Sequence, residues 1–255
     1  MNSPKYYSRE LATDPMRSKR MVKGYEKVIV AQFAKLKKAV KQMFLAVTPN
    51  TSIETIEDDY LILIDEYITN PVQKQITDYL GKSVYSGSVS AIQNLKTIKF
   101  TAAVGILPID PKVVEILNSR NISALKGITD DMSKTFKQEL TEGLVRGEGT
   151  EKLAKRISDS TGVSMNRARV MVRTETAFAF NTARMDQFKK YNVQKVRWFT
   201  ARDERTCVRP IVWNGETYRG CAGLHNKVFD IDKVPPIPLH PQCRCVTMAE
   251  VEEIE

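Results

Sequence analysis

Residues 167–188 read RARVMVRTETAFAFNTARMDQF, and this stretch predicts a long helix. Ser164 is a suitable N-terminal cap, and the helix is expected to run to about Tyr191. Apolar side chains recur on one face at the spacing of a helix that packs against a core. They are Ala168, Met171, Phe178 and Met185. The stretch therefore predicts a helix with one buried face.

Glu175 interrupts this apolar face. At about 100° per residue, it lies about 40° from Met171. A buried carboxylate is costly unless it is hydrogen-bonded or paired, and Arg173 points elsewhere on the same helix. The expected partner is one of four downstream arginines, Arg197, Arg202, Arg205 or Arg244. An internal ion pair that holds the helix against a sheet is the favoured interpretation, and a catalytic carboxylate is the alternative.

Beyond this helix the pattern changes to short strands. KVRWFTA (195–201) is rich in β-branched and aromatic residues, and CRCVTMA (243–249) is a second candidate strand. Between them, IVWNGETYR (211–219) contains Asn214-Gly215, a strong signal for a two-residue hairpin. A small antiparallel sheet is therefore predicted near the C-terminus.

All four cysteines and both histidines lie in the last 50 residues. Zinc binds Cys and His and needs about four ligands, so this clustering predicts a structural zinc site. The predicted ligands are Cys207, Cys221, His240 and Cys243. The alternatives are buried free thiols beside a hydrogen-bonded His240, a Cys–His nucleophilic dyad, or a disulfide from Cys207 under oxidising conditions.

The first 147 residues are predicted to be nearly all helical. Apolar residues step by three or four along 16–44, and fresh helix starts are expected at Asn70-Pro71, at Asp110-Pro111 and at 129–131. Gly87 and Thr161-Gly162 are candidate breaks. The predicted fold class is α+β, with a helical region over 1–147 and a helix-plus-antiparallel-sheet domain over 148–255.

The positive charge of the chain is concentrated at its N-terminal end. The net charge is +9, and residues 1–41 contain eleven Lys and Arg against three Asp and Glu, which leaves +1 for the other 214 residues. Such a segment suits a polyanion or an acidic protein face, and a solvated helix face is the alternative. The predicted DNA-binding residues are Lys19, Arg20, Lys23, Lys27, Lys37, Lys38 and Lys41.

The sequence contains no uncharged apolar run near the ~20 residues that a membrane span requires, and no apolar signal-peptide core. No membrane partner is therefore expected, and a cytosolic origin is predicted.

Three motifs in order carry a resemblance to a known family. The first is Arg173-Thr174-Glu175 with a later Asn181, and the second runs from Trp198 through Asp203, Arg205 and Thr206 to Cys207. The third is His240-Pro241 followed by Cys243, Arg244 and Cys245. Over about 130–248 the chain resembles the phage Mu protein F-like minor head proteins of tailed bacteriophages. The charged motif residues Arg173, Glu175, Asp203 and Arg205 form the predicted structural ion-pair set.

The resemblance implies a non-enzymatic minor head protein at the portal vertex during procapsid assembly, with an expected part in DNA packaging or ejection. It implies three partners: the portal protein, the major capsid or scaffolding protein, and viral double-stranded DNA bound without sequence specificity. The implied location is the virion or procapsid interior, after assembly in the host bacterial cytoplasm. Many relatives have a second cysteine three residues after the first, where this chain has Pro210, so Cys221 would have to substitute as a zinc ligand.

An enzyme is the competing class of function. Domains of this kind also resemble parts of secreted toxins, and an Arg and Glu pair suggests ADP-ribosyl transfer or nuclease activity. The sequence has no phosphate-binding glycine loop of the common types and no H-E-x-x-H zinc motif. A non-enzymatic role is therefore the favoured interpretation.

Overall fold

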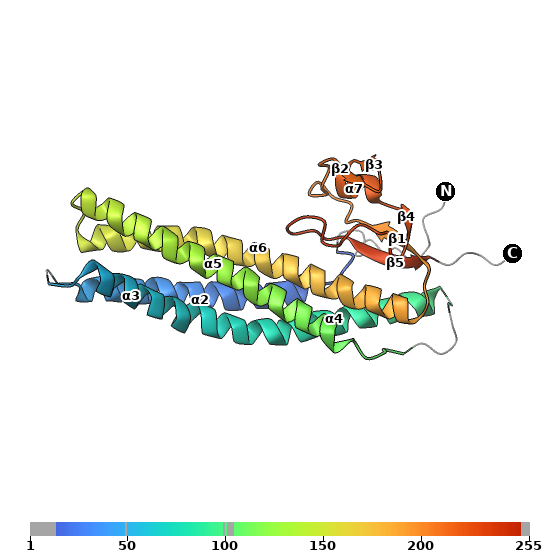
Figure 1. The fold of residues 1–255 in the computed structure, drawn as a ribbon, viewed down its shortest axis with the longest axis horizontal. Coiled ribbons are helices and arrows are strands. Elements are labelled where there is room, and N and C mark those ends of the chain that lie inside the picture. Colours follow the sequence, from blue (N-terminus) through green and yellow to red (C-terminus); the bar gives the residue numbers. More distant parts are fainter. Residues whose placement is uncertain (1–13, 49, 99, 101–104, 251–255) are drawn as a thin grey trace. The chain divides into compact units, whose positions relative to one another are not determined.

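The computed structural model describes residues 14–48, 50–98, 100 and 105–250. It confirms the predicted α+β class, with long helices followed by a small antiparallel sheet (Figure 1). The helical elements are α2 (Lys19–Ala46), α3 (Ile53–Ile64), the π-helical turn η1 (Asp65–Thr69), α4 (Asn70–Thr97), α5 (Pro111–Val145), α6 (Thr150–Lys190) and α7 (Gly220–Leu224). The strands are β1 (Lys195–Phe199), β2 (Ile211–Trp213), β3 (Glu216–Tyr218), β4 (Val228–Asp230) and β5 (Val246–Glu250).

The described residues pack into two compact units. The helical unit consists of Lys23–Tyr79 and Asn118–Val172. The sheet unit consists of the described residues up to Val22, of Leu80–Leu117, and of the chain from Arg173 onward. The predicted boundary at 147/148 falls in the loop between α5 and α6, and the two units do not follow it. As a division into independent domains, that boundary stays a prediction.

The core of the helical unit is built from the apolar face of α2 and its neighbours. Ile29, Phe33, Leu36 and Val40 of α2 have no exposed surface, as their three- and four-residue spacing predicts. In the same core, the rings of Tyr60 and Phe136 stack with their centroids 3.9 Å apart. The face that α2 buries is therefore the one that the spacing of its apolar residues predicts.

The sheet unit contains a three-stranded antiparallel sheet in the order β4-β1-β5. The hairpin of β2 and β3 turns at Asn214 and Gly215, which have φ values of 49° and 81°. These positive angles are the reason that the Asn-Gly pair predicts the turn. The fully buried Trp198 of β1 packs in a cluster with Leu224 of α7 and the C-terminal cysteines.

One predicted helix boundary is wrong, and another coincides with the start of an element. α6 continues through Thr161-Gly162, because the buried Thr161 hydroxyl donates to the Ile157 carbonyl at 2.7 Å and is satisfied inside the helix. The start predicted at Asn70-Pro71 coincides with the first residue of α4, and η1 comes directly before Asn70 without a gap in the helical structure. A π-turn accommodates a residue that has no N–H and whose ring crowds the preceding turn.

Two further expectations fail for similar reasons. α5 runs unbroken past residues 129–131, so the start predicted there does not exist. Gly87 is not a break but lies inside α4, where a Cβ atom would come within 2.2 Å of the Phe180 carbonyl oxygen. Gly87 therefore allows the backbones of α4 and α6 to approach closely within the sheet unit.

Candidate functional site

The turn before Cys243 is held by the start of the Arg-Thr-Glu motif. The Gln242 backbone N–H donates to the Thr174 hydroxyl at 3.0 Å, and the Arg173 guanidinium donates to the Gln242 side-chain oxygen at 3.1 Å. Gln242 has a φ of 60°, in the left-handed region that non-glycine residues seldom adopt. These two contacts therefore fix a turn whose backbone conformation is unfavourable by itself.

Asp203 and Arg244 form a bidentate ion pair that joins the second motif to the third. The two Arg244 nitrogens lie 2.6 and 2.5 Å from the two carboxylate oxygens, and both side chains are largely shielded from water. These hydrogen bonds from Arg244 hold the pKa of the Asp203 carboxyl well below its usual value. The predicted partner Arg205 makes a longer contact of 3.4 Å with Asp203 from an exposed position.

Asn181 completes the junction of the three motifs. Its side-chain amide is buried and donates to the Cys245 carbonyl at 3.2 Å and to the Ala177 carbonyl at 2.9 Å. The later Asn of the first motif thus contacts the last residue of the third. The three motifs are far apart in the sequence, but in the fold they meet around residues 242–245.

Arg184 is an anchor of α6 that the sequence reading missed. It is 3% exposed, and it donates to the Thr247 carbonyl at 2.6 Å and to the Ser90 hydroxyl at 2.5 Å. Asn94 accepts a further bond from Arg184 at 3.3 Å and also binds the backbone N–H of Ala249. An arginine in a helix ordinarily indicates a solvent face, so no local signal identifies this residue.

The structure brings together three of the four predicted metal ligands and adds one. The Cys221, Cys243 and Cys245 sulfurs all lie within 4.8 Å of one another and could hold a metal ion. The Nε2 atom of His240 lies 3.3 Å from the Cys221 sulfur. Cys207 is half-buried at the edge of the same cluster and is not in that group of close thiols among the described residues.

The thiols and the imidazole perturb one another. Hydrogen bonding from Cys221 lowers the pKa of Cys243, and the same contact raises the pKa of Cys221. A hydrogen bond to Cys243 raises the pKa of His240 to about 9. The shifts of Cys221, Cys243 and His240 thus share one cause, the hydrogen bonds that these side chains make with one another. The other histidine, His225, instead accepts a bond from the Thr200 backbone.

Glu175 is buried on α6 in the sheet unit, with 6% of its surface exposed. Its burial is what the apolar face predicts. Its part in the predicted ion-pair set with Arg173, Asp203 and Arg205 stays a prediction.

Five of the predicted DNA-binding residues lie in the helical unit and form what is here called the basic stripe, Lys23, Lys27, Lys37, Lys38 and Lys41. At 100° per residue they fall within an arc of about 100° along α2. All are exposed except the half-buried Lys37, and none forms an ion pair with another described residue. The acidic residue of α2, Glu26, is buried. The other two predicted residues, Lys19 and Arg20, are exposed in the sheet unit.

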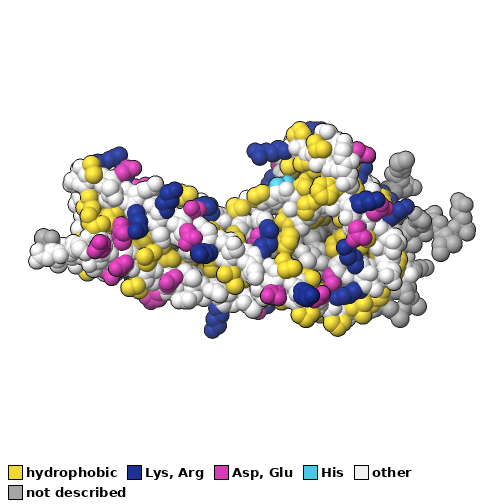
Figure 2. Space-filling model, in the orientation of Figure 1, with side chains coloured by type: hydrophobic (Ala, Val, Ile, Leu, Met, Phe, Trp, Pro, Cys, Tyr) yellow, Lys and Arg dark blue, Asp and Glu magenta, His cyan; other side chains and the backbone are white. Residues whose placement is uncertain are grey.

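Acidic and basic side chains are intermixed over the helices on the face shown in Figure 2. This agrees with a charge close to zero outside the first 41 residues. Among the described residues, no helix is both long and apolar enough to cross a membrane.

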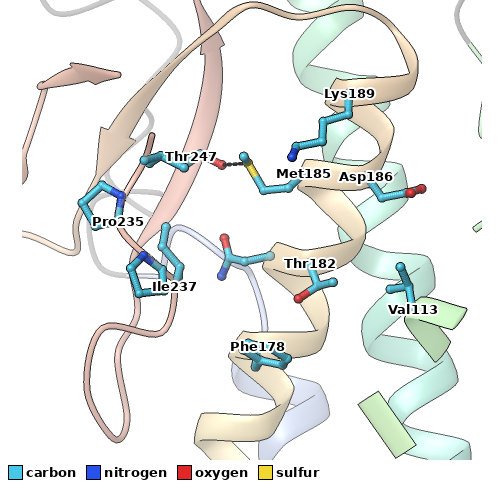
Figure 3. Close-up of a pocket in the computed structure, with 12 residues that line it drawn as sticks. Val113, Phe178, Thr182, Met185, Asp186, Lys189, Pro235, Ile237 and Thr247 are labelled. Carbon is cyan, nitrogen blue, oxygen red and sulfur yellow. Dashed lines mark hydrogen bonds between the residues drawn. The ribbon is translucent and has the colours of Figure 1, made fainter. Parts of the chain in front are cut away.

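A cavity of about 370 Å³ lies in the sheet unit between α6 and the proline-rich segment 234–237 (Figure 3). Phe178, Met185 and Ile237 give it a mostly apolar lining. The charged residues beside it are already paired, Asp186 with Lys190 and Lys189 with Asp232, each at 2.7 Å. Both charged side chains of the lining are therefore engaged in ion pairs.

Comparison with known families gives one match. Residues 134–248 match the family model described as Phage Mu protein F like protein. This segment contains all three motifs, so the resemblance inferred from the sequence is confirmed over it. No curated protein and no solved structure matches the chain.

Proposed function

We propose, from the match to the phage Mu protein F-like family, that this chain is a minor head protein that acts at the portal vertex of a tailed bacteriophage. The family indicates phage head morphogenesis, and the observation that supports this role is the match of residues 134–248 to the family model. In this role the protein joins the procapsid in the host cytoplasm, lies inside the head, and assists DNA packaging or ejection. Its protein partners are the portal protein and a major capsid or scaffolding protein.

The contacts of the three motifs support an architectural role. Thr174 and Arg173 bind the turn at Gln242, and Arg244 pairs with Asp203. These polar groups bond to one another across the motifs, as a structural junction requires. We therefore propose that the protein is not an enzyme.

Co-purification with the portal protein of the same phage tests this role. We expect the chain to elute with the portal ring on size exclusion and to be detected by mass spectrometry in procapsids. An Asp203→Asn variant, which weakens the motif junction, should associate less. The surface variant Lys74→Gln should associate normally, because this side chain is exposed and remote in sequence from the family segment. Failure of the wild-type chain to associate with portal, capsid or scaffolding protein would contradict the proposal.

Sequence-independent binding of double-stranded DNA is the second part of the proposed function. The basic stripe offers cations on one side of a helix without an acidic partner among the described residues. Each phosphate that such a cation neutralises releases counterions, so the affinity should fall steeply with salt. Contacts of this type position a protein on DNA without reading its sequence.

A charge-matched pair of variants tests the stripe. In one, four exposed stripe residues become glutamine, Lys23, Lys27, Lys38 and Lys41. In the control, four exposed lysines elsewhere in the helical unit become glutamine, Lys74, Lys126, Lys134 and Lys152. We expect the stripe variant to lose affinity equally for two unrelated duplexes in fluorescence anisotropy, with a salt slope smaller by up to about four. An equal loss in the control variant would assign the binding to net charge instead.

A structural zinc ion is the cofactor that we propose for the sheet unit. Three close cysteines could hold a metal, and thiolate with imidazole is a ligand set that suits zinc. Bound there, the ion would stabilise the proline-rich C-terminal segment and would supply no chemistry.

A further inference from the structure

Three sulfurs lie within 4.8 Å of one another, and His240 Nε2, which is outside that group, lies beside one of them, the sulfur of Cys221. With Zn–S about 2.3 Å and Zn–N about 2.0 Å, tetrahedral ligands place two sulfurs about 3.8 Å apart and sulfur and nitrogen about 3.5 Å apart. The Cys221 and Cys243 sulfurs are 4.0 Å apart, and Cys221 lies 3.3 Å from His240 Nε2. Each of these two separations is within about 0.2 Å of its tetrahedral value.

The His240 ring is oriented as a metal ligand should be. Its Nδ1 lies 2.8 Å from the Pro241 carbonyl oxygen and donates its proton there. In the neutral ring this bond places the proton on Nδ1, so that the unprotonated Nε2 faces the Cys221 sulfur at 3.3 Å. Metal-bound histidines nearly always donate their second N–H to a carbonyl or carboxylate in this way.

Cys245 is better placed than Cys207 to be the remaining ligand. Its sulfur lies within 4.8 Å of both Cys221 and Cys243, and its thiol contacts the Thr200 hydroxyl at 3.3 Å. Cys221, Cys243 and Cys245 are each 1% exposed, whereas Cys207 is half-buried. A set of four protein ligands in a buried place leaves no position for a water molecule, which is typical of structural zinc.

The competing interpretations explain less. A disulfide needs its sulfurs about 2.05 Å apart, and the Cys221 and Cys243 sulfurs are 4.0 Å apart as free thiols. Thiols that act only as small apolar side chains need no imidazole nitrogen aimed at them. The convergence of three sulfurs and an oriented nitrogen therefore favours a metal.

We infer that Cys221, His240, Cys243 and Cys245 form a closed tetrahedral zinc site, with Cys245 in place of the predicted Cys207. This inference rests on the zinc proposed above and is independent of the proposed role in head assembly. Bound zinc would join α7, the turn at His240 and the start of β5. It would therefore hold the C-terminal segment in place around residues 242–245, where the three motifs meet.

Metal analysis of the full-length protein, purified under reducing conditions, tests the ligand set with a matched pair. We expect about one zinc per chain in the wild type and in Cys207→Ser, and a loss of at least tenfold in zinc affinity in Cys245→Ser. Competition with a colorimetric zinc chelator measures the affinity. Far-UV circular dichroism of each variant shows whether it is folded.

Cobalt substitution supplies a readout that does not depend on stability. The wild type and Cys207→Ser should give the visible bands of tetrahedral cobalt and the same near-ultraviolet thiolate-to-metal band. Cys245→Ser should weaken the thiolate band, even if it still binds metal.

Three outcomes would overturn the inference. If Cys245→Ser kept its zinc affinity and Cys207→Ser lost it, the ligand set predicted from the sequence would be restored. A reduced wild-type protein that takes up no Zn²⁺ or Co²⁺ would remove the metal altogether. A cobalt spectrum of octahedral type would exclude the tetrahedral set. None of these results bears on portal association, whose failure would be seen separately in the co-purification.

Discussion

Gln242 and Arg244 lie two residues apart and stabilise the C-terminal turn in different ways. Gln242 has an unfavourable backbone angle and is held by hydrogen bonds with the Thr174 hydroxyl and the Arg173 guanidinium of α6. Arg244 contributes a charged pair with Asp203. At the scale of single residues, the second and third motifs are thus joined by an ion pair, and the first and third by hydrogen bonds.

The pair of Asp203 and Arg244 should make stability depend on pH in the acid range. The folded pKa of Asp203 is below its unfolded value of about 3.9, so its contribution is complete above that value and is lost as the pH falls below it. Asp203→Asn should cost about 2 kcal/mol at pH 7, because two charge-assisted bonds become weaker. Urea unfolding from pH 7 to pH 3 should show the wild-type and variant curves converging in acid. Parallel curves would contradict the assigned role of this carboxylate.

Arg184 should matter far more to stability than an exposed arginine of the same helix. Arg184→Met leaves acceptors on Ser90, Asn94 and β5 without their donor, and should cost about 3 kcal/mol. Arg167→Met removes a half-exposed pair with Asp131 and should cost less than about 1 kcal/mol. Chemical denaturation compares the two directly. Equal losses would mean that the buried bonds add nothing beyond a surface ion pair.

At the scale of elements, the spacing of apolar residues predicted more of the secondary structure than the helix-capping and helix-breaking residues did. The apolar face of α2, the β2–β3 hairpin and strands β1 and β5 follow from side-chain patterns, because those patterns record which face is buried. The start predicted at 129–131 and the break at Thr161-Gly162 failed, because capping residues also fit inside a long helix when packing supports it. β4 is three residues long and mostly exposed, so it has no pattern to detect.

Gly87 and Gly81 should respond in opposite ways to the same substitution. A Cβ at Gly87 would collide with the backbone of Phe180, so Gly87→Ala should destabilise by about 2 kcal/mol. Gly81, in the same helix, has nothing within 4 Å of its would-be Cβ, so Gly81→Ala should stabilise by up to about 1 kcal/mol. Thermal unfolding of both variants checks the signs. A stabilised Gly87→Ala protein would refute the close approach of α4 and α6 in the sheet unit.

At the scale of the whole molecule, the two compact units are each made of segments that are distant in sequence. The sheet unit needs Leu80–Leu117 as well as the chain from Arg173 onward. Composition and motif order could not reveal this, because they describe the chain in linear order. The candidate metal site was predicted more closely, since three of its four proposed ligands follow from clustering alone. The choice of Cys245 over Cys207 could not be predicted, because the spacing of the cysteines in the sequence does not distinguish the two as the remaining ligand.

A fragment of residues 148–255 should therefore not fold alone. It lacks Ala91, Ile92 and Leu95, which share a core with Phe188 and Val196, and it lacks the partners of Arg184 on α4. We expect an aggregating fragment without a cooperative thermal transition. Co-expression with residues 1–147 should restore a soluble complex, because the cut lies in the loop between α5 and α6. A cooperative transition in the fragment alone would instead support the boundary at 147/148.

The unequal exposure of the four cysteines has a practical consequence. Cys207 is half-buried and the other three are almost fully enclosed, so a maleimide dye should attach to the native protein at one position. A fluorophore there would sit beside the hairpin of β2 and β3 without mutagenesis. It would report distance changes by energy transfer when the protein meets a labelled partner.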